Sequence, residues 1–190
     1  MPANPPFAGE ILPLTPAQRP FLRRVWLERW GGEIVISRGQ SHHFANLPGC
    51  VAILDGELLG LVTYAIQGSE CEVVTLDSLA ERRGVGTALL DAVRRQAEAS
   101  GCTRLWLVTS NDNLPALGFY QRYGFRLAAV HAGALNQTRR LKPSLPLLGL
   151  HGIPLRDELE LELQLYPPKT PVPAPAQPAG IPDSTVQAEP

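Results

Sequence analysis

Apolar residues in the first half of the chain follow the alternation that is typical of β-strands. The segments 51–54 and 57–66 are rich in branched apolar residues and flank Asp55-Gly56, a dipeptide that suits a tight hairpin turn. A second turn at Gly68-Ser69 leads to a further strand over 70–76. The pattern therefore predicts three successive antiparallel strands.

The period changes to that of a helix after residue 84. Val85, Leu89, Val93 and Ala97 recur at every fourth position, with charged residues on the opposite side, and Gly101 ends the segment. An amphipathic helix is therefore expected to begin at Val85. The same reasoning predicts strands at 11–14, 34–36, 105–108 and 125–130, and helices at 16–30 and 114–123.

Three further segments complete the expected organisation. Residues 39–48 are predicted to be a loop, and 132–154, with several Gly and Pro, a long loop of the kind that often serves function. From 155 to 165 leucines alternate with Glu158, Glu160, Glu162 and Gln164, which predicts a last strand with one solvent-facing side. Such a strand could support a homodimer.

Composition divides the chain into a body and two ends. Its 190 residues are 44% hydrophobic and 18% charged, which fits one ordinary globular domain. Most of the 19 prolines lie near the termini. We expect a flexible arm at 1–8, one domain at 9–166 and a disordered Pro/Ala-rich tail at 167–190. A net charge of −1 argues against a nucleic-acid partner.

Cysteine usage and hydropathy favour a cytoplasmic protein. Cys50, Cys71 and Cys102 form neither a disulfide framework nor a metal-ligand pattern, so no metal site is expected. The first residues lack the charged-then-apolar order of a signal peptide. No run of about 18 apolar residues exists, so no membrane partner is expected.

The segment 82–87, Arg-Arg-Gly-Val-Gly-Thr, carries the first sign of chemistry. It lies between a predicted strand and a predicted helix, where two glycines let the backbone approach a ligand closely. Exposed amides at the helix N-terminus favour phosphate oxygens, and Arg82 and Arg83 add positive charge. The segment lacks the Gly-Lys-Ser/Thr element of a Walker loop and the third glycine of a dinucleotide fingerprint. A tight turn without a ligand is the alternative.

A second block, Asn113-Leu-Pro-Ala-Leu-Gly-Phe-Tyr-Gln-Arg-Tyr-Gly-Phe125, follows downstream. Together the two blocks resemble the GNAT superfamily of N-acetyltransferases over residues 70–127. The second block matches that family's Asn-x-x-Ala-x-x-(Phe/Tyr)-Tyr-x-x-x-Gly-Phe pattern at every position. In the first block Glu81 stands where the family usually has Gln or Arg, and we expect its side chain to point outward. The resemblance implies a mixed α/β fold with a mostly antiparallel sheet and helices on both faces.

The resemblance also implies a cofactor site and a general acid. Acetyl-CoA would lie in a cleft between two splayed strands, 70–76 and 104–109. Tyr120 matches the family's general acid, which protonates the departing thiolate and also borders the cofactor. The implied cofactor contacts are the backbone near Leu76 for the pantetheine, Arg82, Arg83, Gly84, Val85, Gly86 and Thr87 for the pyrophosphate, and Asn113 from the following helix.

Two acidic residues are candidates for the catalytic base. Glu70 and Glu72 share one face of a predicted strand, where the family often places a glutamate that acts directly or through water. A solvated strand face is the alternative for each, and Glu72 is favoured because it lies nearer the cleft. Cys71 points the other way and is expected in the core, because no nearby histidine supports a nucleophilic role.

The predicted function is transfer of an acetyl group from acetyl-CoA to a primary amine by direct attack. A non-catalytic acyl-CoA binding or sensing module on the same fold is the alternative. The acceptor is a small molecule or a peptide amine that the sequence does not identify. Arg139, Arg140 and Lys142 form a basic cluster that is either solvated surface or a grip for an acidic group of the acceptor or of a partner subunit.

Overall fold

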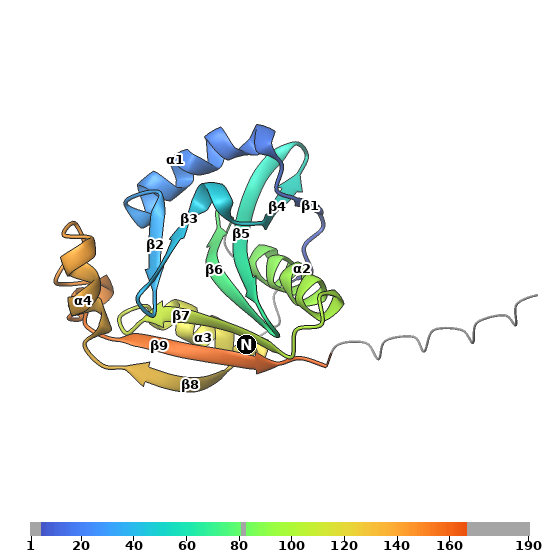
Figure 1. Cartoon of the computed structure of the whole chain (residues 1–190). Coiled ribbons are helices and arrows are strands. Elements are labelled where there is room, and N and C mark those ends of the chain that lie inside the picture. Colours follow the sequence, from blue (N-terminus) through green and yellow to red (C-terminus); the bar gives the residue numbers. More distant parts are fainter. Residues whose placement is uncertain (1–4, 81–82, 167–190) are drawn as a thin grey trace, which may run out of the picture.

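The described residues, 5–80 and 83–166 of this computed structural model, form one large sheet and one small one (Figure 1). The large sheet has the strand order β1-β4-β5-β6-β7-β9-β8, and β2 and β3 form the small sheet. The strands are β1 (Glu10–Pro13), β2 (Ile34–Ser37), β3 (Gln40–His43), β4 (Gly49–Leu54), β5 (Glu57–Gln67), β6 (Glu70–Ser78), β7 (Arg104–Ser110), β8 (Arg126–His131) and β9 (Glu158–Gln164). All neighbouring strands of the large sheet are antiparallel except β6 and β7.

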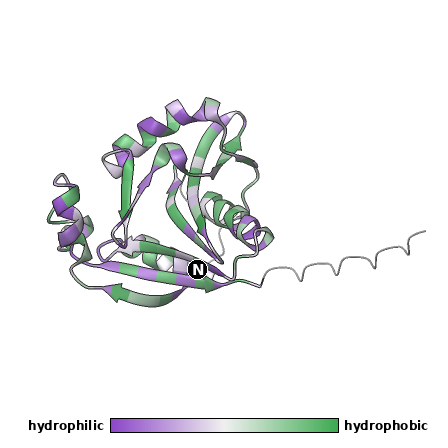
Figure 2. Ribbon diagram, in the orientation of Figure 1, coloured by the Kyte–Doolittle hydropathy of each residue, from purple (hydrophilic) through white to green (hydrophobic). Residues whose placement is uncertain are grey.

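Helices cover both faces of the sheet, as expected. They are α1 (Arg19–Trp30), α2 (Val85–Ala99), α3 (Leu114–Tyr123) and α4 (Ala134–Leu141). The predicted apolar face of α2 is completely buried and packs with β5 and β6 on one side of the sheet. On the other side Leu22, Val25 and Trp26 of α1 pack on Val51 and Leu61. Hydrophobic and hydrophilic residues alternate along both ribbons in Figure 2, as in amphipathic helices.

The three predicted antiparallel strands are confirmed. Asp55 and Gly56 both have positive φ, 52° and 80°, as a tight hairpin turn between β4 and β5 requires. Between β5 and β6 the register shifts, because Thr63 pairs with Thr75 and Tyr64 with Val73. Val74 is therefore the extra residue of a β-bulge, which increases twist and bends β6.

The parallel pair β6 and β7 separates after a short contact. Their register runs only from Glu70 opposite Arg104 to Val73 opposite Leu107. Beyond it β6 continues to Ser78 beside β5, and β7 continues to Ser110 beside β9. The expected cleft between splayed strands is thus present, and the bulge at Val74 lies where the strands part.

Two segments that the sequence predicts as loops contain regular structure. Gln40–His43 of the expected loop 39–48 is β3, which pairs with β2 across a turn at Arg38 and Gly39. The polar sequence Gln-Ser-His-His gives no alternation that would have predicted it. The expected long loop 132–154 contains α4, on which Leu135 and Thr138 are buried.

The last strand differs from its prediction in two ways. Its acidic side is not in water, because Glu158 and Glu160 are only 2% and 4% exposed. The Arg104 guanidinium donates to Glu160 at 2.6 Å and to Glu162 at 2.7 Å, which compensates part of this buried charge. β9 also lies between β7 and β8, so it offers no free edge to a second copy. The homodimer stays a prediction, and an edge of β9 is not the place where a second copy could pair.

Replacing Arg104 by methionine is expected to destabilise the fold by about 3 kcal/mol, because it leaves Glu160 buried without its main counter-ion. Although burial raises the pKa of Glu160, hydrogen bonds from Arg104 and His131 lower it overall. The cluster therefore stabilises the fold at neutral pH and loses that effect as the pH falls below about 4.5. Urea unfolding at pH 7 and pH 4 measures both effects.

The matched control is Arg126→Met. Arg126 also contacts Glu162, at 2.8 Å, but its side chain is 75% exposed. Its loss should change the free energy of unfolding by less than about 1 kcal/mol. Equal losses in the two variants at pH 7 would contradict the role given to Arg104.

Candidate active site

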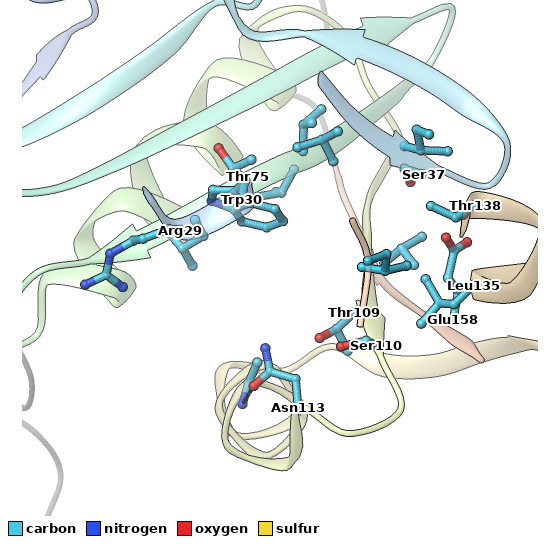
Figure 3. A pocket seen from close by; sticks show the side chains of 18 of the residues that line it. Arg29, Trp30, Ser37, Thr75, Thr109, Ser110, Asn113, Leu135, Thr138 and Glu158 are labelled. Carbon is cyan, nitrogen blue, oxygen red and sulfur yellow. Dashed lines mark hydrogen bonds between the residues drawn. The ribbon is translucent and has the colours of Figure 1, made fainter. Parts of the chain in front are cut away.

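A cavity of about 600 Å³ opens where β6 and β7 separate (Figure 3). One wall is Glu72–Asp77 of β6 and another is Val108–Ser110 of β7 with Asn113 and Tyr120 of α3. The remaining lining comes from the end of α1, from β2, from α4 and from the chain that follows α4. The residues are Arg29, Trp30, Val35, Ile36, Ser37, Ala116, Leu135, Thr138, Lys142, Leu145, Leu150, Leu155 and Glu158.

The backbone of β6 beyond the bulge borders this cavity. Leu76, predicted to lie beside the pantetheine, is one of the lining residues. In the strand register, residues 75–78 pair with β5 alone and not with β7. Peptide groups along such an unpaired edge can bind an extended ligand as an added strand does.

The turn before α2 has the geometry that its glycines predict. Gly84 caps the helix with φ of 72°, a left-handed conformation that favours glycine. A Cβ atom on Gly86 would lie 3.1 Å from the Phe119 ring of α3, so glycine permits this close helix packing. Val85 is buried in the core, whereas Arg83 and Thr87 are exposed. Glu81 and Arg82 lie outside the described residues.

The N-terminal segment lies against this turn. A Cβ atom on Gly84 would be 2.5 Å from the Pro5 carbonyl oxygen and 2.9 Å from the Phe7 nitrogen. Phe7 also packs against the core cluster around α2. Part of the predicted arm at 1–8 is thus seated beside the turn that the sequence assigns to pyrophosphate.

The two tyrosines at the end of α3 have different surroundings. The Tyr123 hydroxyl donates to Asp91 Oδ1 at 2.6 Å and so links α3 to α2. Tyr120 packs edge-on against Phe125 and lines the cavity. Burial, and then the nearby negative charge of Asp77, raise the pKa of Tyr120 well above its usual range. The phenol therefore stays protonated and available as a donor.

The two candidate bases lie in different places. Glu72 lines the cavity, is 5% exposed, and has its Oε2 3.1 Å from Nε2 of His42. Glu70 is not among the residues that line the cavity; it pairs with Arg104 at 3.1 Å, and its side chain is 45% exposed. The cavity thus brings together Glu72, Tyr120, Leu76 and Asn113, but not Glu70.

The buried thiol of Cys71 has its pKa raised to about 12 by burial, as expected of a core residue.

Sequence reasoning missed His42, which it treated as a loop residue. The side chain is 9% exposed and reaches Glu72 from β3, on the inner side of the β2–β3 hairpin. Its Nε2 makes no hydrogen bond of good geometry within the described residues. His42 and Glu72 are therefore close neighbours that are not hydrogen-bonded to each other. No local pattern predicts a contact over such a separation in sequence.

Asp77 is a second buried acid that the sequence did not single out. Trp30 Nε1 donates to Asp77 Oδ2 at 3.0 Å, and Arg29 Nη1 lies 3.9 Å from the other carboxylate oxygen. Burial raises the pKa of Asp77, and the Trp30 hydrogen bond and the Arg29 charge oppose this rise. Asp77 thereby ties the end of α1 to β6 and keeps the cavity wall in place.

The segment from α4 to β9 is held as a fixed wall. Arg139 donates to the carbonyls of Pro146 and Leu155, and Lys142 Nζ donates to the Trp30 carbonyl. Asp112 is buried and accepts a hydrogen bond from the Leu150 amide at 2.7 Å. In the predicted basic cluster, Arg139 and Lys142 therefore donate hydrogen bonds to backbone carbonyls. Burial lowers the pKa of Lys142.

A sheet that splits at a bulge, with a glycine turn at the adjacent helix and a buried acid and phenol in the split, defines an acyltransferase fold. The chain matches the Acetyltransferase (GNAT) family over residues 14–125. It is also 40% identical over 151 residues to the uncharacterized protein YdhI of Bacillus subtilis (strain 168), covering 78% of this chain and 94% of that protein. The chain belongs to the GNAT family of acetyltransferases, which use acetyl-CoA as acetyl donor.

Solved structures agree with this assignment. A Bacillus subtilis acetyltransferase in complex with CoA is 25% identical, with a TM-score of 0.55 over 64% of this chain and 79% of that one. A GNAT family acetyltransferase from Elizabethkingia anophelis with acetyl-CoA bound shares the fold, with a TM-score of 0.61 and 20% identity over 82% of this chain and 97% of that one. The predicted family and fold are confirmed.

Membrane-spanning helices and metal-ligand clusters are both absent from the described residues. Within 5–80 and 83–166 no helix has the length and hydropathy needed to cross a membrane. The same part of the chain contains no group of three or more His, Cys, Asp or Glu side chains placed to hold a metal ion.

Proposed function

We propose that this protein transfers the acetyl group of acetyl-CoA to a primary amine by direct attack, with Glu72 as base and Tyr120 as acid. The observation that carries the proposal is that these two residues face one cavity at the point where β6 and β7 part. A buried carboxylate and a protonated phenol are the groups that an amine nucleophile and a thiolate leaving group require.

The shape of the site fits the donor. The unpaired edge of β6 at Leu76 suits an extended pantetheine arm with amide groups. At the start of α2 the backbone amides and the helix dipole favour the pyrophosphate, which we assign to residues 82–87. Asn113 Oδ1 accepts a hydrogen bond from the Ala116 amide, and its side chain borders the cavity from the α3 side.

The reaction needs proton transfers at two atoms. A protonated amine, with a pKa near ~10.4, has no free electron pair, so Glu72 first accepts a proton from it, directly or through water. The neutral nitrogen then forms a bond to the acetyl carbon while the carbon–sulfur bond breaks. Tyr120 donates its proton to the leaving sulfur, and the proton that the nitrogen loses on becoming an amide restores Tyr120 through solvent. The products are an acetamide, free coenzyme A and one proton.

The test is release of coenzyme A thiol during incubation of the full chain with acetyl-CoA and a library of amines. The library includes small amines, peptides with free N-termini and peptides with lysine. Turnover with any of these amines supports the proposal. Tight binding of acetyl-CoA without turnover on any amine would instead favour the acyl-CoA binding or sensing module.

Replacing Gly84 by alanine is expected to weaken coenzyme A binding at least about tenfold. The new Cβ would meet Pro5 in a turn that is already left-handed, so the amides assigned to pyrophosphate must shift. Gly101→Ala is the matched control, because Gly101 has φ of 78° with nothing near its Cβ position. Titration calorimetry with coenzyme A compares the two; equal dissociation constants would count against this phosphate site.

The proposal also includes the cellular location, the class of acceptor and the oligomeric state. Cys50, Cys71 and Cys102 are all free thiols, which suits the reducing cytoplasm. We propose that the acceptor is a small molecule or a peptide that carries a primary amine. A homodimer is a further prediction, which size-exclusion chromatography with light scattering tests.

A further inference from the structure

Glu158 is a buried carboxylate that the proposed reaction does not use. Its side chain lines the cavity from the start of β9, and the residue is 2% exposed. The Arg38 backbone amide donates to its Oε2 at 3.1 Å. Burying a carboxylate in this way is costly unless a partner compensates its charge.

The Ser37 hydroxyl lies unpartnered at the same end of the cavity. Ser37 is 6% exposed, and its Oγ makes no hydrogen bond within residues 5–80 and 83–166. Buried hydroxyls are nearly always hydrogen-bonded, so the Ser37 hydroxyl in this cavity wall is available to bind a polar group of a ligand. In Figure 3 the Glu158 carboxylate points toward the side of the cavity where Ser37 lies, beside Leu135 and Thr138.

The charges around Glu158 leave it undercompensated. Burial raises its pKa, and the Glu72 carboxylate raises it further, against opposing effects of Arg38 and His131. Neither Arg38 nor His131 is dedicated to Glu158, because the Arg38 guanidinium lies 3.4 Å from Glu160 and His131 Nε2 lies 2.7 Å from Glu160. Lys142, the other cation in this part of the wall, donates to backbone carbonyls of Trp30 and Ile34.

The amine that is acetylated cannot supply the missing charge. This amine must lose its proton to react, and its nitrogen becomes part of a neutral amide. It therefore cannot neutralise the charge of Glu158 throughout the reaction. A group that stays protonated through the reaction could neutralise Glu158 and donate to Ser37 Oγ at once, because an ammonium group offers three N–H donors.

We propose that the acceptor carries a second cationic group, and that Glu158 and Ser37 bind this group while Glu72 serves the reacting amine. The inference rests on the proposed function for the reacting end of the acceptor. It defines the acceptor class as compact diamines, in which one nitrogen is acetylated and the other stays protonated at the Glu158 end of the cavity.

The experiment compares three sets of probes with the full chain. They are 1,3-diaminopropane to 1,5-diaminopentane, the monoamines of the same lengths, and ω-amino acids that carry a carboxylate in place of the second ammonium. We expect kcat/KM to be highest for one of the diamines and lowest for the amino acids. Glu158→Gln should reduce kcat/KM for that diamine about 10- to 100-fold and change that for the monoamine less than about threefold.

Ser37→Ala is the second variant and should lower kcat/KM for the diamine alone by about 3- to 10-fold. Equal losses for diamine and monoamine in Glu158→Gln, or no preference for diamines in the unmodified protein, would overturn the proposal while leaving the acetyltransferase function intact. Calorimetric titration of diamines into the protein saturated with coenzyme A gives a readout without turnover. There, binding that Glu158→Gln abolishes supports the inference even if no amine is acetylated, and equal binding to both proteins refutes it.

Discussion

Replacing Tyr120 by phenylalanine is expected to lower kcat for acetyl transfer by about 100- to 10,000-fold, the contribution typical of a positioned general acid. The leaving thiolate then departs without the proton that Tyr120 would supply. Phenylalanine keeps the packing on Phe119 and Phe125, so the dissociation constant for coenzyme A should change little. Steady-state thiol release and calorimetry measure the two quantities.

Tyr123→Phe provides the control on the same helix. Its hydroxyl donates to Asp91 and does not line the cavity, so kcat should stay within about twofold while the free energy of unfolding falls by about 1 kcal/mol. If Tyr120→Phe retains full activity, or if both variants lose activity equally, Tyr120 is not the acid.

The part of the site that we assign to the donor could be predicted because its signals are local. A turn with two glycines, an amphipathic helix after it and the block from Asn113 to Phe125 all lie in continuous sequence. Each follows from short-range physics: left-handed φ at Gly84, an apolar face on α2, and a capped start of α3. The structure therefore confirms these elements almost as predicted.

The end of the cavity that we assign to the acceptor could not be predicted because its residues come together only through tertiary packing. Ser37 and His42 belong to a hairpin whose turn has a positive φ of 49° at Arg38. Positive φ is uncommon for arginine, so the sequence does not predict this turn. The alternating pattern predicts that Glu158 faces solvent. In the structure it lies instead in the cavity wall with residues of the β2–β3 hairpin and α4. Alternation shows that two faces differ, but not that both are buried.

The same point explains why the sequence could rank Glu72 above Glu70 as a candidate base but could not exclude Glu70. They share one face of β6, two residues apart, and differ only in what lies opposite. Glu70 faces Arg104 at the closed end of the parallel pair, and Glu72 lies next to the split. The place where two strands cease to pair is set by the bulge and by β9, neither of which a single-strand pattern contains.

Glu72→Gln is therefore expected to have a large and pH-dependent effect. Near pH 7 kcat/KM should fall about 100- to 10,000-fold, because the variant can use only the small fraction of amine that is already neutral in solution. That fraction rises with pH toward the amine pKa near ~10.4, so the loss should shrink steadily between pH 7 and pH 10.

His42→Ala distinguishes a base from a merely structural carboxylate. If Glu72 is the base and His42 positions it at 3.1 Å, the His42 variant should show a smaller loss than Glu72→Gln but the same dependence on pH. Glu70→Gln, two residues away and outside the cavity, should leave the pH profile unchanged. A loss in Glu72→Gln that is constant from pH 7 to pH 10 would mean that Glu72 shapes the cavity without moving a proton. A pH-dependent loss in Glu70→Gln instead would transfer the role of base to that residue.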